Sequence, residues 1–409
     1  MGTLELAGTP EDFGLDPQRL ARISPHFDAY VADLRLPGWL ATVSRGGQLV
    51  WRGSGGHRDV AAALPVTDDT VWRIYSMTKP LTSVAVMMLY EEGCFDLFDD
   101  VGQWIEALRE PRVYVSGSPT SPKTEPATEP VRVHHLLSHL SGLTYGFHYT
   151  HPVDAMYRAR GYEFASPRDM NLEQVVNDWC SLPLLFQPGS KWNYSVSVDV
   201  LGRLIELWSG QSIESFFRER LLDPLGMVDT EWWCPPDKQD RLAMLYVPTR
   251  HGAAPHADIA KAATREPAWR GGGGGLVSTA HDYDRFMAFL LNGGELDGVR
   301  LLSERTVALM TENHLPDDGD LEKWAVDSFS EEKQAGVGFG LGFSVVVDRR
   351  KNKSLVSEGT YGWGGAASTV FWVDPAEELS VAFYTQLLPS STYNIRRELQ
   401  QFVYGALTD

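Results

Sequence analysis

Strand-like patterns gather near the two ends of this sequence, and that distribution limits the folds that the chain can adopt. Apolar or alternating segments of strand length, bounded by turn residues, occur at 39–45, 48–54, 337–347, 366–373 and 379–385. The first two flank Gly46-Gly47, which is a hairpin turn signal. Because residues 132–250 show no convincing strand pattern, we predict one antiparallel sheet built from both ends of the chain.

Helical patterns fill the middle of the chain and recur near its ends. Apolar residues at helical spacing occur at 15–35, 171–181, 195–209, 212–222 and 392–406. The polar, proline-rich residues 116–130 predict an exposed loop. No internal repeat is visible, so a repeat architecture is not indicated.

These patterns predict an α/β (α+β) fold, in which an antiparallel sheet is flanked by helices and joined to a mainly helical domain. The length of 409 residues suits two such domains. We predict that residues 1–85 and 265–409 form the sheet domain, and that residues 86–264 form the helical domain.

The acidic charge of the chain narrows the partners that it can have. A formal net charge of −18 argues against nucleic acid and anionic membranes, and leaves a small-molecule substrate open. The three cysteines, Cys94, Cys180 and Cys234, lack metal-ligand spacing. We see no signal peptide pattern at Met1 to Pro10 and no apolar run of about 18 residues, so we expect a cytoplasmic protein. The oligomeric state is left open.

Lys79 is the only lysine in the first 122 residues, and it stands three positions after Ser76. Residues three apart on a helix share a face, so the Ser76 hydroxyl and the Lys79 amine can meet. An apolar helix runs from here to about Glu92, with Gly93 as its expected C-terminal cap. Pro80 is tolerated only in a first turn, which places Ser76 at the helix N-terminus. A lysine buried there needs a role, and the best one is to take the proton of a nucleophilic serine.

Ser-x-x-Lys by itself is a weak signal, and a second match occurs at Ser330 to Lys333. That match lies in a charged run with no apolar helix after it, so we interpret it as solvated surface. The alternative for the first match is a buried serine beside a lysine whose charged end reaches solvent.

Two other segments carry candidate site residues. Tyr194 follows a turn and precedes a predicted helix start, and a phenol beside a cation can exchange protons. The segment from Tyr361 to Ala366 is rich in glycine and precedes a strand, so it would allow a ligand to approach the backbone. A core tyrosine and an ordinary turn are the alternatives.

Three further patterns favour structural explanations. The glycine run (Gly271–Gly275) lacks the lysine and the strand–loop–helix context of a phosphate loop, so we expect flexibility or close packing. A histidine cluster lacks His-Glu-x-x-His and a clear third ligand, which disfavours a metal site; its members are His134, His135, His139, His148 and His151. No Gly-x-Ser-x-Gly occurs, which argues against an α/β-hydrolase.

Taken in order, the candidate motifs resemble those of the serine β-lactamase and penicillin-binding superfamily. The three motifs are Ser76-Met77-Thr78-Lys79, Tyr194-Ser195-Val196 and Trp363-Gly364-Gly365. Supporting matches lie at residues 136–143, 197–202, 274–279 and 338–342, and the resemblance spans about residues 15–405. It is strongest to the class C-like esterases, family VIII carboxylesterases, whose fold agrees with the prediction made from the strand and helix patterns.

The resemblance also implies a role for each site residue. Ser76 would be the nucleophile, Lys79 its base partner and Tyr194 the proton shuttle. The backbone N–H groups of Ser76 and Ala366 would form the oxyanion hole. The substrate-binding residues would be Trp363, Gly364, Gly365 and Tyr361. Neither a metal nor an organic cofactor is implied.

Two departures from the β-lactamase pattern point to esters. Val196 replaces an asparagine that would hold a β-lactam side chain, and Trp363 replaces a cation that would pair with a substrate carboxylate. Binding must then come from apolar contact, which favours short-chain neutral esters. An acyltransferase of the same fold is the main alternative, followed by a β-lactamase or a D-amino-acid peptidase. A catalytically silent binding module is the alternative of a different class.

Overall fold

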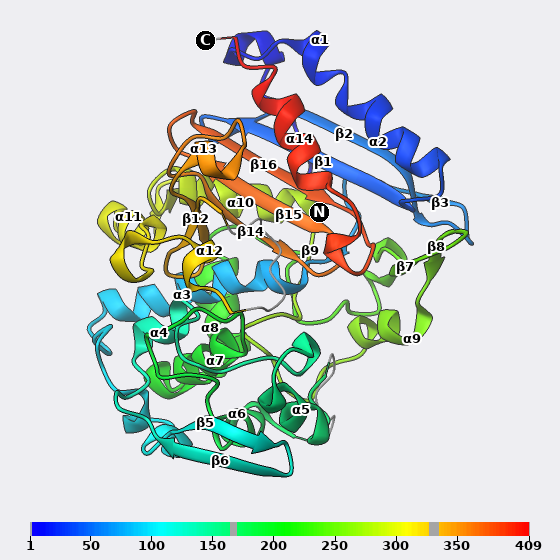
Figure 1. Cartoon of the computed structure of the whole chain (residues 1–409). Helices are drawn as coiled ribbons and strands as arrows, with labels where there is room; N and C mark the ends of the chain where they lie inside the picture. The colour runs from blue at the N-terminus through cyan, green and yellow to red at the C-terminus, as the bar shows by residue number, and fades with distance from the viewer. Residues whose placement is uncertain (1, 164–169, 327–334, 409) are drawn as a thin grey trace.

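An eight-stranded sheet made from both ends of the chain forms the centre of the computed structural model, which describes residues 2–163, 170–326 and 335–408. Its strand order is β12-β13-β14-β15-β16-β1-β2-β3, and every neighbouring pair is antiparallel (Figure 1). The strands are β1 (Gly38–Arg45), β2 (Gln48–Asp59), β3 (Leu64–Pro65), β12 (Val337–Phe339), β13 (Ser344–Val346), β14 (Tyr361–Gly365), β15 (Thr369–Asp374) and β16 (Leu379–Tyr384). The predicted sheet is therefore confirmed, and β1 pairs directly with β16.

Alternating side chains along β15 divide the core into two layers. Val370 and Trp372 pack with α1 (Pro17–Leu20), α2 (Ile23–Ala32) and α14 (Ile395–Tyr404), which lie across the outer face of the sheet (Figure 1). Phe371 points to the inner face, where its ring centre is 5.0 Å from that of Tyr283 in α10 (Ala280–Leu291).

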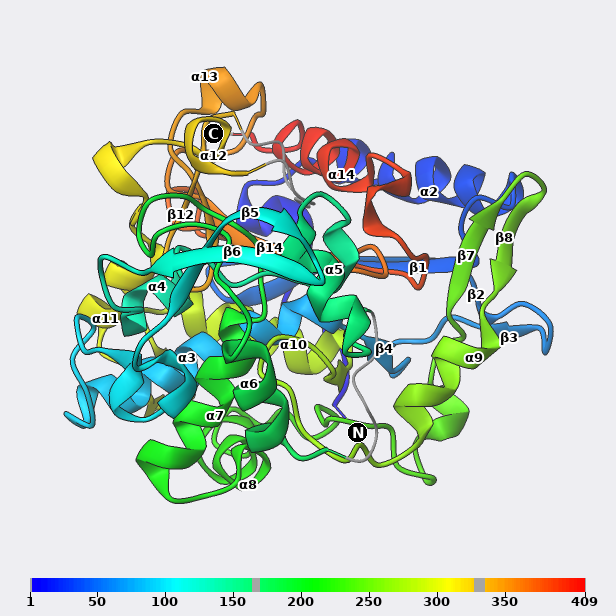
Figure 2. The same cartoon turned by 60° about the horizontal axis from the view of Figure 1, so that its bottom comes forward.

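The helical part lies beyond the inner face, around α3 (Thr78–Glu91) and α7 (Ser197–Ser209) (Figure 2). Around them lie α4 (Val133–Leu137), α5 (Pro152–Ala159), α6 (Leu172–Cys180) and α8 (Ile213–Phe217). Helices elsewhere in the described chain are α9 (Ala257–Ala260), α11 (Glu304–Thr311), α12 (Leu321–Trp324) and α13 (Arg349–Asn352). No helix in the described part of the chain has both the length and the apolar character needed to cross a membrane.

The remaining strands form short two-stranded pairs. They are β4 (Trp72–Arg73) with β9 (Val277–Ser278), β5 (Arg112–Ser118) with β6 (Ser121–Pro126), β7 (Tyr246–Thr249) with β8 (Gly252–Pro255), and β10 (Glu295–Leu296) with β11 (Val299–Arg300). The β5–β6 hairpin occupies much of the segment predicted as a loop. Its side chains are mostly exposed and polar, so it has no apolar alternation to reveal it.

Two predicted elements are interrupted by turns. The strand predicted at 337–347 is two strands, because Gly342 turns the chain with a φ of +107° between β12 and β13. The helix predicted at 15–35 is α1 followed by α2. The predicted helices at 171–181 and 195–209 are confirmed as α6 and α7, and the one at 392–406 is confirmed as α14.

Candidate active site

The residues just before Ser76 have a constrained backbone, and they place this serine at the start of α3. Tyr75 has a φ of +43°, a region that costs a bulky residue about 1–3 kcal/mol. The buried guanidinium of Arg73 holds the preceding strand, because it donates to the Ala243 carbonyl at 2.5 Å and the Ala260 carbonyl at 2.6 Å. Ser76 lies in the 3-10 turn Tyr75–Met77 and remains partly exposed. The predicted position at the helix N-terminus is confirmed.

Lys79 lies in the first turn of α3 and is buried, with 2% of its surface exposed. Its Nζ is 3.4 Å from Ser76 Oγ, as the three-residue spacing predicted. The same Nζ donates to the Gly273 carbonyl at 2.5 Å. All of Thr78 to Leu89 is buried, and Gly93 ends the helix with a φ of +75°. The lysine is therefore held against the serine by a rigid core helix.

Tyr194 lies beside this pair, although it is 115 residues away in sequence from Lys79. Lys79 Nζ is 4.6 Å from the centre of the Tyr194 ring. Trp363 Nε1 lies 3.5 Å from the Tyr194 hydroxyl, and both side chains are buried. His148 Nε2 donates to the Tyr194 backbone carbonyl at 2.6 Å. The structure thus brings the serine, lysine, tyrosine and tryptophan of the three motifs together.

The end of β14 lies against the residues that precede Ser76. A Cβ added to Gly365 would be 2.4 Å from the Ile74 carbonyl, so only glycine permits this approach. Ala366 and Tyr75 pack into the same small apolar cluster as Leu245 and Leu388. Ala366, like Ser76, is partly exposed, and it directly follows the glycine that packs against Ile74.

The predicted substrate-binding residues lie at different distances from the serine along β14. Gly364 and Gly365 are buried at its Ser76 end, and Trp363 contacts Tyr194. Tyr361 lies at the opposite end, where its buried ring packs at 5.2 Å on Phe343. Tyr361 therefore supports the strand from its far end.

The glycine run packs tightly and contacts the site directly. The Gly272 carbonyl accepts from Thr82 Oγ1 at 2.7 Å, and the Gly273 carbonyl accepts from Lys79. The Gly273 N–H donates to Asp199 Oδ1 at 2.8 Å. A Cβ on Gly273 would lie 2.3 Å from Asp199 Oδ2. Of the two structural explanations considered, close packing is therefore the one that the structure supports.

Gly273→Ala should destabilise the protein by about 1–3 kcal/mol, the usual cost of overpacking, because Asp199 has to move. The substitution should also lower kcat/KM, since it would displace the Gly273 carbonyl that accepts a hydrogen bond from Lys79. Thermal unfolding and ester hydrolysis measure the two effects. Gly274→Ala is the matched control, because its Cβ would be an ordinary 3.6 Å from Tyr75. Equal behaviour of the two variants would contradict this role of Gly273.

Asp199 and Tyr145 complete the surroundings of Lys79, and neither was singled out as a site residue from the sequence. Tyr145 is hydrogen-bonded to Asp199, and burial, followed by the nearby carboxylate, raises the pKa of Tyr145 well above its usual value. Burial also raises the pKa of Asp199, although the Lys79 charge, the Gly273 amide and Tyr145 oppose it. Tyr145 therefore stays protonated, and its hydroxyl donates a hydrogen bond to the Asp199 carboxylate. The sequence feature that could have pointed to Asp199 is its position in the first turn of a helix.

The clustered histidines have structural partners. His139 Nδ1 lies 3.1 Å from Ser195 Oγ, and His135 Nδ1 accepts from the Arg132 amide at 3.1 Å. Burial, followed by the charge of Lys79, lowers the pKa of His139 well below its usual value. His139 is therefore neutral and adds no second cation to the site. No group of three or more possible metal ligands occurs among the described residues. The second Ser-x-x-Lys match, at residues 330–333, lies outside the residues that the structure describes.

Comparisons with known proteins identify the family and agree with the fold. The Beta-lactamase family model matches residues 23–405. Protein Rv1367c of Mycobacterium tuberculosis is 35% identical over 82% of this chain and 82% of its own length. Esterase EstB of Burkholderia gladioli is 30% identical over 92% of this chain and 93% of its own length. The solved structure of EstCE1, a hydrolase with promiscuous acyltransferase activity, has a TM-score of 0.80 at 24% identity, covering 95% and 98% of the two chains.

Proposed function

This chain belongs to the Beta-lactamase family, and from that premise we propose that it is a carboxylesterase that cleaves short-chain neutral esters through an acyl-enzyme on Ser76. The observation that carries the proposal is the 3.4 Å contact between Lys79 Nζ and Ser76 Oγ, with Tyr194 beside it. The similarity of this chain to EstB, an esterase by name, supports ester chemistry within the family.

In the proposed first half-reaction, Ser76 Oγ attacks the ester carbonyl and its proton passes to Lys79, directly or through Tyr194. The new C–O bond gives a tetrahedral intermediate. When this intermediate collapses, the ester C–O bond breaks and the Lys79/Tyr194 pair returns the proton to the leaving alkoxide. The Gly273 carbonyl orients the amine throughout, because it accepts one Nζ–H.

In the second half-reaction, a water molecule attacks the acyl-enzyme and gives a proton to the same pair. When this second tetrahedral intermediate collapses, the bond between the acyl carbon and Ser76 Oγ breaks and the Lys79/Tyr194 pair returns the proton to Oγ. The carboxylic acid is released and the Ser76 hydroxyl is restored. In both steps the backbone N–H groups of Ser76 and Ala366 are proposed to hold the oxyanion. Loss of one such donor typically raises the barrier by about 3 kcal/mol.

The substrate preference follows from the groups that face the site. Trp363 is apolar apart from its indole N–H, which faces the Tyr194 hydroxyl, and Val196 carries no hydrogen-bonding group. The small apolar cluster that includes Tyr75 and Ala366 borders the serine. These residues offer no side-chain partner to a substrate carboxylate, so uncharged acyl groups are favoured.

A rate profile over p-nitrophenyl esters of rising chain length, with nitrocefin alongside, tests the proposed function. We expect kcat/KM for p-nitrophenyl acetate or butyrate to exceed that for nitrocefin by about 100-fold or more, a difference of roughly 3 kcal/mol in transition-state binding. A higher kcat/KM for nitrocefin would instead favour a β-lactamase.

Acyl transfer is the second candidate, because it uses the same acyl-enzyme and differs only in the acceptor. EstCE1, which shares the fold, is described as having promiscuous acyltransferase activity. Adding an alcohol during p-nitrophenyl butyrate turnover separates the two activities. Butyric acid as the main product supports hydrolysis, whereas an ester of the added alcohol supports transfer.

Asp199→Asn should move the acid limb of the kcat/KM pH profile to lower pH by about one unit. The change removes a negative charge near Lys79 but keeps an acceptor for Gly273 N–H. Without that charge the neutral lysine forms more readily, and a shift of one pKa unit corresponds to about 1.4 kcal/mol. Asp282→Asn is the matched control, since Asp282 is also buried but accepts hydrogen bonds from the Asp229 backbone N–H and the Thr230 hydroxyl. An unshifted profile in Asp199→Asn would contradict the coupling.

A further inference from the structure

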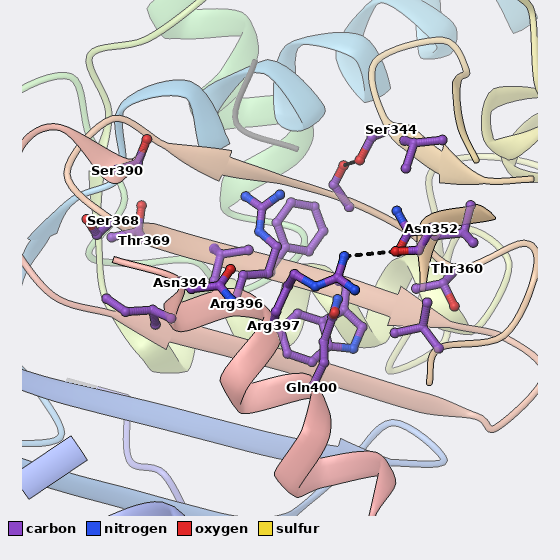
Figure 3. Close-up of a pocket in the computed structure, with 18 of the residues that line it drawn as sticks. Ser344, Asn352, Thr360, Ser368, Thr369, Ser390, Asn394, Arg396, Arg397 and Gln400 are labelled. Atoms are coloured by element: carbon purple, nitrogen blue, oxygen red, sulfur yellow. Dashed lines mark hydrogen bonds between the residues drawn. The ribbon is translucent and has the colours of Figure 1, made fainter. Parts of the chain in front are cut away.

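A cavity lies on the outer face of the sheet, and none of its described lining residues belongs to the Ser76 site. It has a volume of about 390 Å³, within the range of small-molecule sites. β13, β14 and β15 form its floor, and residues 390–397 with α14 cover it (Figure 3). Gly362 of β14 pairs with Trp372 and with Ser344, so the middle of the floor has no side chain. We call this space the outer-face cavity.

The described residues that line the outer-face cavity include two arginines and lack acidic groups. None of the 22 described lining residues is Asp or Glu, although the 54 acidic residues among 409 would place about three in a set of that size. Arg396 and Arg397 enter it from α14, with Ser390 and Asn394 at one end (Figure 3). Among the described lining residues, the two arginines are therefore the charged side chains, in a chain of net charge −18.

Neighbouring elements carry further basic residues, of which Arg350 pairs with Asp348 and Lys351 with Asp320. Arg397 Nη1 donates to the Asn352 carbonyl at 2.9 Å, which joins α14 to the end of α13. α13 itself has the sequence Arg349-Arg350-Lys351-Asn352, and Lys353 follows it. The first turn of α14 also lies at the cavity, and the Asn394 side chain does not cap it. The positive end of a helix dipole favours an anion.

The rest of the lining is suited to an apolar group. Val346, Val370 and Trp372 belong to or pack against the outer core and border the cavity. Hydroxyl and amide side chains surround them, including Ser391, Thr392 and Gln400. A ligand here would meet guanidinium groups at one side and apolar side chains at the other.

We propose that the outer-face cavity binds a small organic oxyanion, a carboxylate or a phosphate ester with a short apolar part. Guanidinium groups bind both oxyanions through paired, charge-assisted hydrogen bonds. The proposal does not depend on the chemistry at Ser76, because β15 and α14 build the cavity on the other face of the sheet.

Isothermal titration calorimetry with benzoate, phenyl phosphate and neutral benzyl alcohol tests the proposal on the full chain. We expect one of the two anions to bind at least about tenfold more tightly than benzyl alcohol, because only an anion gains the charge-assisted bonds. Tighter binding of phenyl phosphate identifies a phosphate ligand, and tighter binding of benzoate identifies a carboxylate. Equal binding of the neutral compound, or no binding of either anion, would overturn the proposal.

Substitutions in the outer-face cavity test whether the anion binds there. Arg396→Gln should weaken the preferred anion about tenfold or more, whereas Arg109→Gln, an exposed arginine of the helical part, should leave it unchanged. Val346→Phe fills the cavity without touching either arginine and should also abolish binding. Thermal unfolding confirms that each variant is folded. Unchanged affinity in both cavity variants would show that the anion binds elsewhere, and would reject the outer-face cavity.

Discussion

Ser76→Ala should abolish the turnover of p-nitrophenyl butyrate, with a fall in kcat of about 1,000-fold or more. The side chain of Ser76 is the partly exposed hydroxyl at the head of α3, and its Oγ is the atom that Lys79 Nζ contacts at 3.4 Å. Without Oγ no acyl-enzyme can form. The loss should occur without a change in thermal stability, because alanine fits the same helix start.

Ser330→Ala is the matched control for this change. Ser330 heads the second Ser-x-x-Lys match, which was interpreted as solvated surface from its charged surroundings. Its replacement should leave kcat unchanged. Retained activity in Ser76→Ala, or a comparable loss in Ser330→Ala, would overturn the assignment of the nucleophile.

Lys79→Met should lower kcat/KM by about 100- to 10,000-fold, the usual contribution of a positioned acid–base group. Methionine keeps much of the buried stem and removes the amine that faces Ser76 and Gly273. Because the Gly273 carbonyl then loses its donor, a stability loss of about 1–3 kcal/mol should accompany the change. Steady-state kinetics below the unfolding temperature separates the two effects.

Lys79→Arg distinguishes a proton acceptor from a simple cation at this position. A guanidinium stays protonated at all pH values used for enzymes, so it keeps the charge but cannot accept the Ser76 proton. We therefore expect Lys79→Arg to be as inactive as Lys79→Met. Activity near the wild-type value in Lys79→Arg would show that the site needs only a positive charge.

The sheet could be predicted from the sequence because its strands carry their own patterns. β1, β2, β15 and β16 are apolar or alternating runs next to clear turns. β14 was not predicted as a strand, because three of its five residues are glycine and glycine carries no strand preference. The β5–β6 hairpin was missed for a related reason, since its exposed side chains face water on both sides.

The site was predictable where local spacing determines geometry. Ser76 and Lys79 meet because three residues make almost one helical turn. Tyr194 and Trp363 could be chosen only through the resemblance, because their contact joins residues 169 apart. The roles of Gly273, Asp199 and Tyr145 depend on how α7 and the glycine run pack around Lys79, and no local pattern encodes that packing.

The central claim is that Ser76 is an activated nucleophile, and a covalent probe tests it most directly. The protein is mixed with a fluorophosphonate, digested, and analysed by mass spectrometry. The account predicts a single phosphonyl adduct on the peptide that contains Ser76, absent in Ser76→Ala and formed much more slowly in Lys79→Met. An unlabelled Ser76, or a label on another residue while esterase activity is lost, would contradict it.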